Sequence, residues 1–436
     1  MIGLNSRLKQ LEQDGVIIHT AIVGAGQMGR GLVNQMCCMK CLRPSVLVDH
    51  TPAKAKGVFL SAGVDECLIA YAATAEEAQN LLEQGKFVYS EQLATAVCTP
   101  SVQAVVDATG SPDSGAEIAT RAIAHKKHVV MLNVETDVVV GPILMHKAQE
   151  AGVVYTGSAG DEPGAVKELF DFADAVGLTI KVIGKGKNNS VDLYCNPDSV
   201  RQEALDRGIA PHMLSSFKDG TKTMVEMTAM SNSTGFVPDV RGGHGPVVTQ
   251  QNAVEILRLK EQGGILNSYG TIEYVDGLAP GVFAIVSSDK PDILHQLTYL
   301  KLGAGPNYLL YRPFHLGSIE TPISIAMAVL DGRATIAPEY GMVSQTITFA
   351  KKDLAAGQYL DGIGGYTIYG RIERTETALR ERALPISLVN AKTRLKVGVK
   401  KDTLITWDMV EMDETSPVLR LYREQERLFE KIHPSK

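Results

Sequence analysis

Two short segments combine acidic and basic side chains at spacings that suit catalysis. Asp161 and Glu162 are adjacent in the glycine-rich segment Gly157–Gly164, and Lys222 precedes Glu226 by four residues. Residues four apart share one face of a helix. Carboxylate oxygens are the ligands that Mg²⁺ and Mn²⁺ prefer, and a lysine beside a carboxylate can move a proton or stabilise an alkoxide. We therefore take Asp161, Lys222 and Glu226 as candidate catalytic residues.

Each segment also has a purely structural interpretation. Asp161 can cap a helix that begins near Pro163, and Lys222 with Glu226 can form an exposed ion pair worth less than about 1 kcal/mol. Three methionines lie on the same predicted helix as Lys222, at positions 224, 227 and 230, and favour its burial. A buried lysine–carboxylate pair is costly to desolvate, which favours the functional interpretation.

Further polar side chains near these segments are candidates for substrate binding. Hydroxyl and amide groups in two loops offer donors to a phosphate or a polyol, and the segment Arg241–Pro246 offers a cation and a titratable ring. Such a glycine-rich segment can close over an anionic substrate, or it can be a mobile surface loop. The candidate substrate residues are Ser158, Ser231, Asn232, Arg241 and His244.

A glycine motif lies near the start of the chain, between the apolar run Ile17–Val23 and an amphipathic helix. In the pattern Gly-x-Gly-x-x-Gly, Gly24 makes a tight turn, Gly26 lets the backbone approach a pyrophosphate, and Gly29 lets helix and strand pack closely. The amides of Gln27 and Met28 then face the phosphates from the positive end of the helix dipole. These residues predict a nicotinamide dinucleotide site.

The cofactor site extends to the ends of neighbouring predicted strands. Asp49 ends the strand Ser45–Asp49 about 20 residues after the last glycine, where ribose hydroxyls are recognised. Thr109 and Gly110 follow a third strand, and Asn133 follows a fourth. We expect these last three residues to lie beside the nicotinamide.

Apolar runs and amphipathic segments alternate up to about residue 156, which predicts a doubly wound parallel sheet. Its expected strands are Ile17–Val23, Ser45–Asp49, Phe87–Tyr89, Ala104–Asp107, Val129–Leu132 and Val153–Thr156, with helices Gly115–His125 and Pro142–Ala151. We expect this Rossmann domain at 1–156, an α+β catalytic and dimerisation domain at 157–332, and a small all-β domain at 333–436. The middle part should contain helices over Phe170–Val176, Gly220–Met230 and Thr321–Leu330, with strands at Leu178–Ile183 and within Thr271–Ser287.

The composition is that of an ordinary globular protein: 436 residues, 44% hydrophobic and 21% charged. A net charge of −6 gives no support to a nucleic-acid partner. No run of 18 apolar residues is present, so no membrane partner is expected. The first ten residues, Met1–Gln10, predict an amphipathic helix in place of a signal peptide, which indicates a cytoplasmic protein. The six cysteines lack the spacing of a zinc site and are expected to be reduced thiols.

Several of these motifs together resemble known families. The glycine motif at 24–29, the loop at 157–164 and the region around Asp219 and Lys222 are similar to homoserine dehydrogenase. The terminal hundred residues resemble the SAF β-clip module. The combination resembles the deoxyxylulose phosphate reductoisomerase-like family. That resemblance implies a homodimer that uses NADPH and Mn²⁺ or Mg²⁺ to convert 1-deoxy-D-xylulose 5-phosphate to 2-C-methyl-D-erythritol 4-phosphate in isoprenoid biosynthesis, with inhibition by fosmidomycin.

By analogy with ordinary reductoisomerases, the resemblance also implies roles for individual residues. Asp161 and Glu226 would hold the metal with Glu162 as a third ligand, and Lys222 would stabilise an alkoxide. The phosphate would be held by Ser231 and Asn232, with His244 from the loop. This chain departs from the reductoisomerase pattern, because no spacer separates Asp161 from Glu162 and one extra residue separates Lys222 from Glu226.

The cofactor preference and the reaction have alternatives. Asp49 favours NAD by the ribose rule, whereas the family implies NADPH; Lys54 or Lys56 would then meet the 2′-phosphate and Asp49 would turn away. A carboxylate about 4 Å from that phosphate would cost on the order of 4 kcal/mol. The alternative reactions are dehydrogenation of homoserine or a sugar acid without rearrangement. A non-catalytic protein that senses the cofactor is the alternative of another class.

Overall fold

The computed structural model describes residues 3–187 and 190–432, and they divide into two compact units. The first unit contains the residues up to 161 together with 316–337 and those from 416 onward; the second contains 162–315 and 338–415. The segment expected as a third domain is therefore shared between the two units. The division into three consecutive domains stays a prediction.

Seven parallel strands form the sheet of the first unit, which confirms the predicted fold class. Their order is β3-β4-β2-β1-β5-β6-β7. Apolar side chains in these strands are buried because helices cover both faces of the sheet. The sequence analysis missed only β3, whose three residues are half-buried or exposed. The strands are β1 (Ile18–Val23), β2 (Leu42–Val48), β3 (Ile69–Tyr71), β4 (Phe87–Ser90), β5 (Ala104–Asp107), β6 (His128–Met131) and β7 (Tyr155–Gly157).

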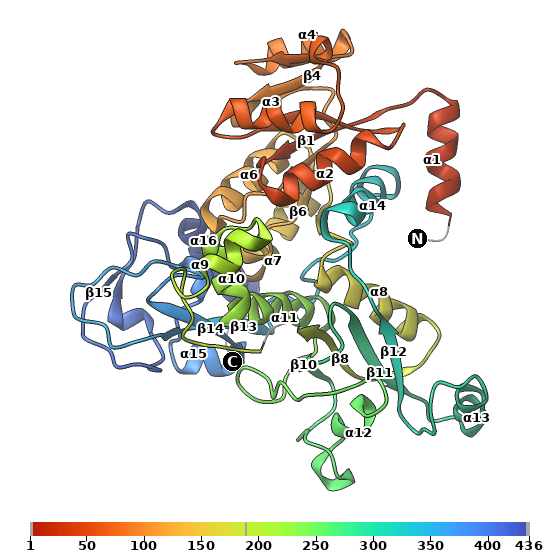
Figure 1. The fold of residues 1–436 in the computed structure, drawn as a ribbon, viewed down its shortest axis with the longest axis vertical. Helices are drawn as coiled ribbons and strands as arrows, with labels where there is room; N and C mark the ends of the chain where they lie inside the picture. The colour runs from red at the N-terminus through yellow and green to blue at the C-terminus, as the bar shows by residue number, and fades with distance from the viewer. Residues whose placement is uncertain (1–2, 188–189, 433–436) are drawn as a thin grey trace. The chain divides into compact units, whose positions relative to one another are not determined.

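Helices from three distant parts of the chain complete the first unit. On one face, α2 (Gln27–Cys37), α3 (Pro52–Ser61) and α14 (Gly317–Asp331) pack into one hydrophobic cluster. In Figure 1 the teal helix α14 lies beside the red helix α2. Another group of helices, α6 (Pro112–Ala124), α7 (Val134–Ala151) and α16 (Pro417–Ile432), packs together. The remaining helices are α1 (Leu4–Gln13), α4 (Ala75–Glu83) and α5 (Leu93–Val97).

Several boundaries in the first unit differ from the sequence prediction. The helix expected from Pro142 begins eight residues earlier, because Asn133 caps it by accepting a hydrogen bond from the Thr136 amide at 3.3 Å. Pro142 therefore lies inside α7. The N-terminal helix is present as α1, while Met1 and Ile2 lie outside the described residues.

The second unit is built on a mixed five-stranded sheet of order β12-β11-β8-β10-β9. Its strands are β8 (Thr179–Lys187), β9 (Val237–Pro238), β10 (Thr271–Asp276), β11 (Val282–Ser287) and β12 (Tyr308–Arg312). One face packs against α8 (Glu162–Ala175) and α11 (Thr221–Thr234). The predicted strand Leu178–Ile183 is too short, because β8 continues through Gly184 to Lys187.

The rest of the second unit consists of short elements. Strands β13 (Ser344–Ala350) and β14 (Ile368–Arg374) form an antiparallel pair that packs on α11, and β15 (Arg394–Leu395) pairs with β16 (Val410–Glu411). The helices are α9 (Arg201–Arg207), α10 (Pro211–Lys218), α12 (Ala253–Ile256), α13 (Pro291–Tyr299) and α15 (Thr375–Arg380). The sequence analysis predicted no helix or strand between Ile183 and Gly220, where α9 and α10 lie. Among the described residues, no helix has the length and apolarity needed to cross a bilayer.

Candidate functional site

The glycine turn after β1 has the geometry that close backbone approach requires. Gly24 has φ +106°, and a Cβ there would lie 2.7 Å from the Ala108 carbonyl oxygen. A Cβ at Gly29 would lie 1.9 Å from the Gly24 carbonyl oxygen, whereas a Cβ at Gly26 would meet nothing within 4 Å. The tight turn and the close helix–strand packing are thus confirmed. Gly26 leaves open space beside the start of α2, where a pyrophosphate would approach Gln27 and Met28.

A cavity of about 330 Å³ opens beside this turn and is lined in part by Gly26, Asp49, His50, Lys54 and Thr109. Asp49 is buried, and its carboxylate accepts hydrogen bonds from the backbone amides of Ala25 at 2.8 Å and Thr51 at 3.0 Å. One acid therefore ties the glycine turn to the end of β2.

The basic groups near Asp49 differ in their availability. The Lys54 ammonium is half exposed and lies 3.8 Å from the Asp49 carboxylate. The Lys56 ammonium pairs with Glu66 at 2.7 Å. Lys54, unlike Lys56, lines the cavity.

A buried network arranges the loops after β5 and β6. Asp107 accepts hydrogen bonds from the Thr109 amide at 2.9 Å, the Thr109 hydroxyl at 2.7 Å and the Asn133 amide group at 2.9 Å. Burial raises the pKa of Asp107 above its usual value. The predicted nicotinamide neighbours Thr109 and Asn133 are therefore brought together by an acid that the sequence analysis did not select, while Gly110 makes the adjoining turn with φ +69°.

The loop at 157–164 divides at the boundary of the two units. The Ser158 hydroxyl is buried, lies 2.9 Å from the Thr321 hydroxyl and accepts a bond from the Gly160 amide at 3.3 Å. Asp161 is the last residue of this part of the first unit, and Glu162 is the first residue of α8. The structure thus gives Ser158 partners within its own unit.

The second unit brings together an acid–lysine cluster centred on β8. Successive residues of a strand point to opposite faces. Ile183 packs on the α8 and α11 side, so Lys185 and Lys187 face the same side. On the opposite side space is tight, since a Cβ at Gly184 would lie 2.0 Å from the Glu273 carbonyl oxygen and one at Gly186 would lie 2.3 Å from the Ala279 nitrogen. The Gly-Lys-Gly-Lys pattern thus aims two lysines at α8 and α11.

Lys185 joins two carboxylates that come from different helices. Its ammonium lies 2.7 Å from Glu162 of α8 and also pairs with Glu226 of α11, and both it and Glu226 are buried. Burial alone would lower the pKa of Lys185, but the two carboxylates outweigh it and raise the pKa above its usual value. Burial and the neighbouring Glu162 raise the pKa of Glu226, against the opposing charges of Lys185 and Lys222. Glu162, Lys185 and Glu226 form the Lys185 cluster, in which two acids that share one ammonium can hold and release a proton.

Three further titratable groups surround this cluster. The His315 ring lies 3.3 Å from the Glu162 carboxylate. The buried Lys187 ammonium donates a bond of 2.6 Å to the Phe217 carbonyl oxygen, and burial together with the charge of Lys185 lowers the pKa of Lys187 to about 8. Lys222 acts electrostatically on Glu226, as its place one turn earlier on α11 predicts. Carboxylate oxygens and an imidazole nitrogen together form a donor set that can hold a divalent cation.

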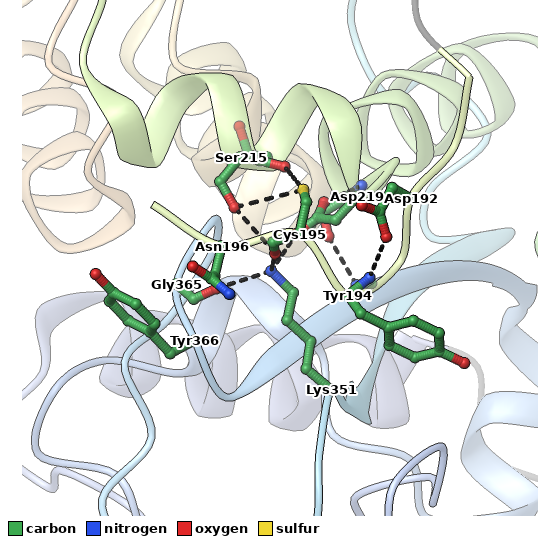
Figure 2. A network of polar contacts seen from close by, with 12 residues as sticks. Asp192, Tyr194, Cys195, Asn196, Ser215, Asp219, Lys351, Gly365 and Tyr366 are labelled. Carbon is green, nitrogen blue, oxygen red and sulfur yellow. Dashed lines mark hydrogen bonds and ion pairs between the residues drawn. The ribbon is translucent and has the colours of Figure 1, made fainter. Parts of the chain in front are cut away.

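A second buried ion pair fixes the turn that precedes α11 (Figure 2). Asp219 accepts a hydrogen bond from the Thr221 amide at 2.8 Å, and its other oxygen lies 2.8 Å from the Lys351 ammonium. That ammonium also donates to the carbonyl oxygens of Cys195 and Gly365, both at 2.8 Å. Lys351 thereby holds the segment before α9, the loop before β14 and the start of α11 in one arrangement.

Two of the residues expected to bind phosphate are engaged within the second unit. The Ser231 hydroxyl donates to the Phe236 carbonyl oxygen at 2.5 Å and contacts the Ser344 hydroxyl at 2.6 Å. The Asn232 carbonyl group accepts bonds from the Val343 amide at 2.9 Å and the Ser344 amide at 3.0 Å. Both side chains are buried. They tie α11 to the start of β13, and their assignment to phosphate stays a prediction.

The segment 241–246 is anchored by polar contacts. Arg241 pairs with Glu373 and Glu381, both at 2.6 Å, and the His244 ring lies 2.8 Å from the Asp239 carboxylate. The buried Glu273 accepts the His244 amide at 2.8 Å. Arg241 and His244 therefore both have partners within the second unit, and their assignment to substrate binding stays a prediction.

The sequence analysis did not identify Lys185, Lys187, His315 or Lys351. A signal for two of them was present, because lysines at alternate positions of an otherwise apolar strand require buried partners. The partners themselves lie 23 and 41 residues away from Lys185 along the chain. His315 and Lys351 carry no comparable pattern in the sequence.

Comparisons with known proteins give distant similarities in structure. A probable dehydrogenase from Thermotoga maritima is 12% identical with a TM-score of 0.41; the alignment covers 74% of this chain and 92% of that one. A myo-inositol dehydrogenase from Corynebacterium glutamicum is 10% identical with a TM-score of 0.40, over 73% and 90% of the two chains. Similarities at this level carry no argument about activity. No curated protein matches the sequence. Residues 160–321, which include the whole Lys185 cluster, match the family model described as "Oxidoreductase DRL, catalytic domain".

Proposed function

We propose that this protein is an NAD(P)-dependent oxidoreductase that reduces or forms a carbonyl group in a small polar substrate. The observation that carries the proposal is the glycine turn after β1, where Gly26 leaves open space beside a cavity of about 330 Å³. Free space beside Gly26, with close contacts to the backbone at Gly24 and Gly29, fits a dinucleotide pyrophosphate. The match of residues 160–321 to an oxidoreductase catalytic domain supports the second half of the proposal.

The Lys185 cluster has the chemistry that carbonyl reduction needs. As hydride from the nicotinamide reaches the carbonyl carbon, negative charge develops on the oxygen and a proton must follow. Lys185 supplies a charged donor in a site from which water is largely excluded, and Glu226 can take up or release the balancing proton. Lys222 adds a second positive charge near Glu226. In the reverse direction the same groups accept the proton of an alcohol.

The residues present also fit a divalent cation. Glu162 and His315 offer an oxygen and a nitrogen 3.3 Å apart, and Asp161 precedes Glu162 directly in the chain. Glu162, His315 and Glu226, which all lie in the second unit, would hold Mn²⁺ or Mg²⁺, and the role of Asp161 as a ligand stays a prediction. Such an ion, when bound, polarises a hydroxyketone through its oxygens. The Lys185 ammonium shares both acids, so it would help to balance their charge in the absence of the ion.

For the specific reaction we propose two candidates. The resemblance of the motifs and the family match over 160–321 favour conversion of 1-deoxy-D-xylulose 5-phosphate to 2-C-methyl-D-erythritol 4-phosphate, with NADPH and a divalent cation. The position of Lys185 between two of the predicted metal ligands favours the alternative, dehydrogenation of homoserine or a sugar acid, because lysine and carboxylates can assist hydride transfer without a metal. A homodimer stays a prediction in either case.

For the cofactor we propose NADPH with the 2′-phosphate near Lys54 and His50, which line the cavity. The Asp49 carboxylate already accepts hydrogen bonds from the backbone amides of Ala25 and Thr51. Lys54→Met should raise the KM for NADPH at least about 10-fold and leave the KM for NADH within about 2-fold, since a charge-assisted contact contributes roughly 1.5–3 kcal/mol. An equal change for both cofactors would contradict the placement of the phosphate.

The decisive experiment follows the absorbance of the reduced nicotinamide with purified protein. Deoxyxylulose phosphate and NADPH are supplied with Mn²⁺, with EDTA, and with Mn²⁺ plus fosmidomycin; homoserine and sugar acids are supplied with NAD⁺ and NADP⁺. Oxidation of NADPH that requires Mn²⁺ and stops with fosmidomycin supports the reductoisomerase. Reduction of NAD(P)⁺ by homoserine or a sugar acid, unchanged by EDTA, supports the dehydrogenase.

A variant pair tests the role of the cluster itself. Lys185→Met should lower turnover at least about 100-fold, the usual contribution of a positioned proton donor, with dinucleotide binding retained. Lys181→Met is the matched control on the same strand, because Lys181 lies over the Tyr269 ring and outside the acid cluster. Dinucleotide binding with no turnover on any of these substrates, in the intact protein, would favour a cofactor-sensing protein over an enzyme.

A further inference from the structure

The second unit contains another cavity, of about 300 Å³, that shares no residue with the Lys185 cluster. Besides Leu193, it is lined by Tyr194, Arg241, Phe349, Tyr369, Arg371 and Asp402. Its volume lies at the lower end of the range for small-molecule sites. The cavity wall carries two guanidinium groups, three aromatic rings and one carboxylate.

The two arginines of this cavity differ in how their charges are balanced. Arg241 pairs with both Glu373 and Glu381. Arg371, on β14, pairs with Ile347 of β13 through its backbone, but its guanidinium forms no hydrogen bond or ion pair with any other residue that the structure describes. A guanidinium carries several N–H donors in one plane, and without an acid partner it favours binding of an anion.

The position of the Arg371 side chain is built into the backbone around it. A Cβ at Gly242 would lie 2.3 Å from the Arg371 Nε, so the guanidinium occupies space that only a glycine leaves free. Gly242 has φ +78°, and its amide donates to the Ile372 carbonyl oxygen at 2.8 Å. The segment 241–243 therefore holds the guanidinium at the cavity wall.

Asp402 gives the same cavity an acceptor. Its two carboxylate oxygens each accept a tyrosine hydroxyl at 3.0 Å, from Tyr194 and from Tyr369. Asp402 has φ +63°, a backbone conformation that few residues other than glycine adopt and in which Asp and Asn are enriched. A carboxylate oxygen can accept more than one hydrogen bond, so Asp402 can still receive a donor from a ligand.

We propose that this cavity binds a small organic acid with a hydrogen-bond donor next to its carboxylate, that is, an α-amino or α-hydroxy acid. The ligand carboxylate pairs with Arg371, and its ammonium or hydroxyl group donates to Asp402. Phe349 and Tyr369, stacked with their ring centroids 5.6 Å apart, supply a flat apolar wall for the side chain. The Lys401 ammonium, 3.2 Å from the centre of the Tyr194 ring, adds positive charge near the rim.

Four probes of similar size test this chemistry by ligand-observed NMR titration of the full-length protein. L-alanine and L-lactate carry the carboxylate with an ammonium or a hydroxyl, propionate carries the carboxylate alone, and inorganic phosphate is a plain anion. We expect saturable binding of alanine or lactate that is at least about 10-fold tighter than that of propionate or phosphate, because one additional charge-assisted hydrogen bond is involved. The preferred probe of the two identifies the class.

Variants connect this binding to the cavity. Arg371→Gln should weaken the preferred probe at least about 10-fold, and Arg371→Lys should weaken it less because the charge is kept. Asp402→Asn tolerates the same backbone and should remove the preference over propionate. Arg380→Gln, an exposed arginine on α15, is the control and should change nothing.

Several results would overturn the proposal. They are the absence of saturable binding of both alanine and lactate, equally tight binding of propionate or phosphate, or unchanged binding in Arg371→Gln. Fluorescence of Trp407, in the same unit, checks that each variant is folded, and Arg371→Lys serves if Arg371→Gln does not fold. Dinucleotide binding is measured in parallel, so that loss of the proposed cofactor site is distinguished from loss of this cavity.

Discussion

Replacing Lys187 by methionine should raise the free energy of unfolding of the second unit at neutral and acidic pH, and this gain should be smaller at alkaline pH. The Lys187 ammonium is buried beside Lys185, and the pKa of Lys187 falls from 10.5 to about 8. A group whose pKa is lowered by folding weakens the folded state when it is protonated. This cost is absent above the unfolded-state pKa of 10.5, grows as the pH falls, and is complete below the folded-state pKa of about 8.

The size of the effect follows from the shift. A difference of about 2.5 pKa units at about 1.4 kcal/mol per unit gives roughly 3 kcal/mol. Below pH 8 the wild type bears this cost and the methionine variant does not. The free energy of unfolding of Lys187→Met minus that of the wild type should therefore be about 3 kcal/mol larger at pH 6 than at pH 10.5, with the change falling between pH 8 and 10.5.

The measurement is urea unfolding followed by the fluorescence of Trp407, the only tryptophan in the chain, which lies in the second unit. Lys396→Met is the control, because an exposed ammonium of the same unit keeps its hydration on folding. A difference between Lys187→Met and wild type that stays constant within about 1 kcal/mol from pH 6 to pH 10.5 would refute the reasoning.

Three further predictions concern packing and charge. Gly29→Ala should weaken dinucleotide binding at least about 10-fold or destabilise the first unit, because its Cβ would lie 1.9 Å from a carbonyl oxygen. Gly57→Ala, in open space within α3, is the control: it should leave binding unchanged and should not lower the melting temperature. Lys351→Met should cost about 3–5 kcal/mol in urea unfolding by leaving the buried Asp219 carboxylate unpaired, and adding Asp219→Asn should recover part of that loss; two additive losses would contradict the pairing. Glu226→Gln should lower turnover at least about 100-fold with dinucleotide binding unchanged, and an equal loss of both would indicate a structural role.

Local patterns were sufficient to predict most of the first unit. Six of its seven strands were expected from apolar runs, because a parallel sheet covered on both faces buries nearly every strand residue. The glycine turn was equally predictable, since its three glycines all lie within the short segment Gly24–Gly29. The strand β3 was missed because its residues are partly exposed and carry no such pattern.

Local patterns predicted only some of the residues of the candidate site. Glu162, Lys222 and Glu226 were selected from their local spacing, and the structure places all three in or beside the Lys185 cluster. Ser231 was selected for a donor group that the structure shows bonded to β13 and to the Phe236 carbonyl group. A hydroxyl group in a sequence does not reveal whether a neighbouring strand already uses it.

By itself, the sequence determined the strand–turn–helix at Gly24–Gly29, the parallel sheet around it and the presence of acids and lysines on two later segments. The tertiary structure alone decided which charges meet. Lys185 reaches Glu162 and Glu226 because the alternation of β8 turns Ile183, Lys185 and Lys187 toward α8 and α11, while crowding behind Gly184 and Gly186 allows no side chain on the other face. Glu162 and Glu226 lie 23 and 41 residues from Lys185 along the chain. The packing of helices on a sheet brings them together, and no short-range spacing in the sequence predicts this contact.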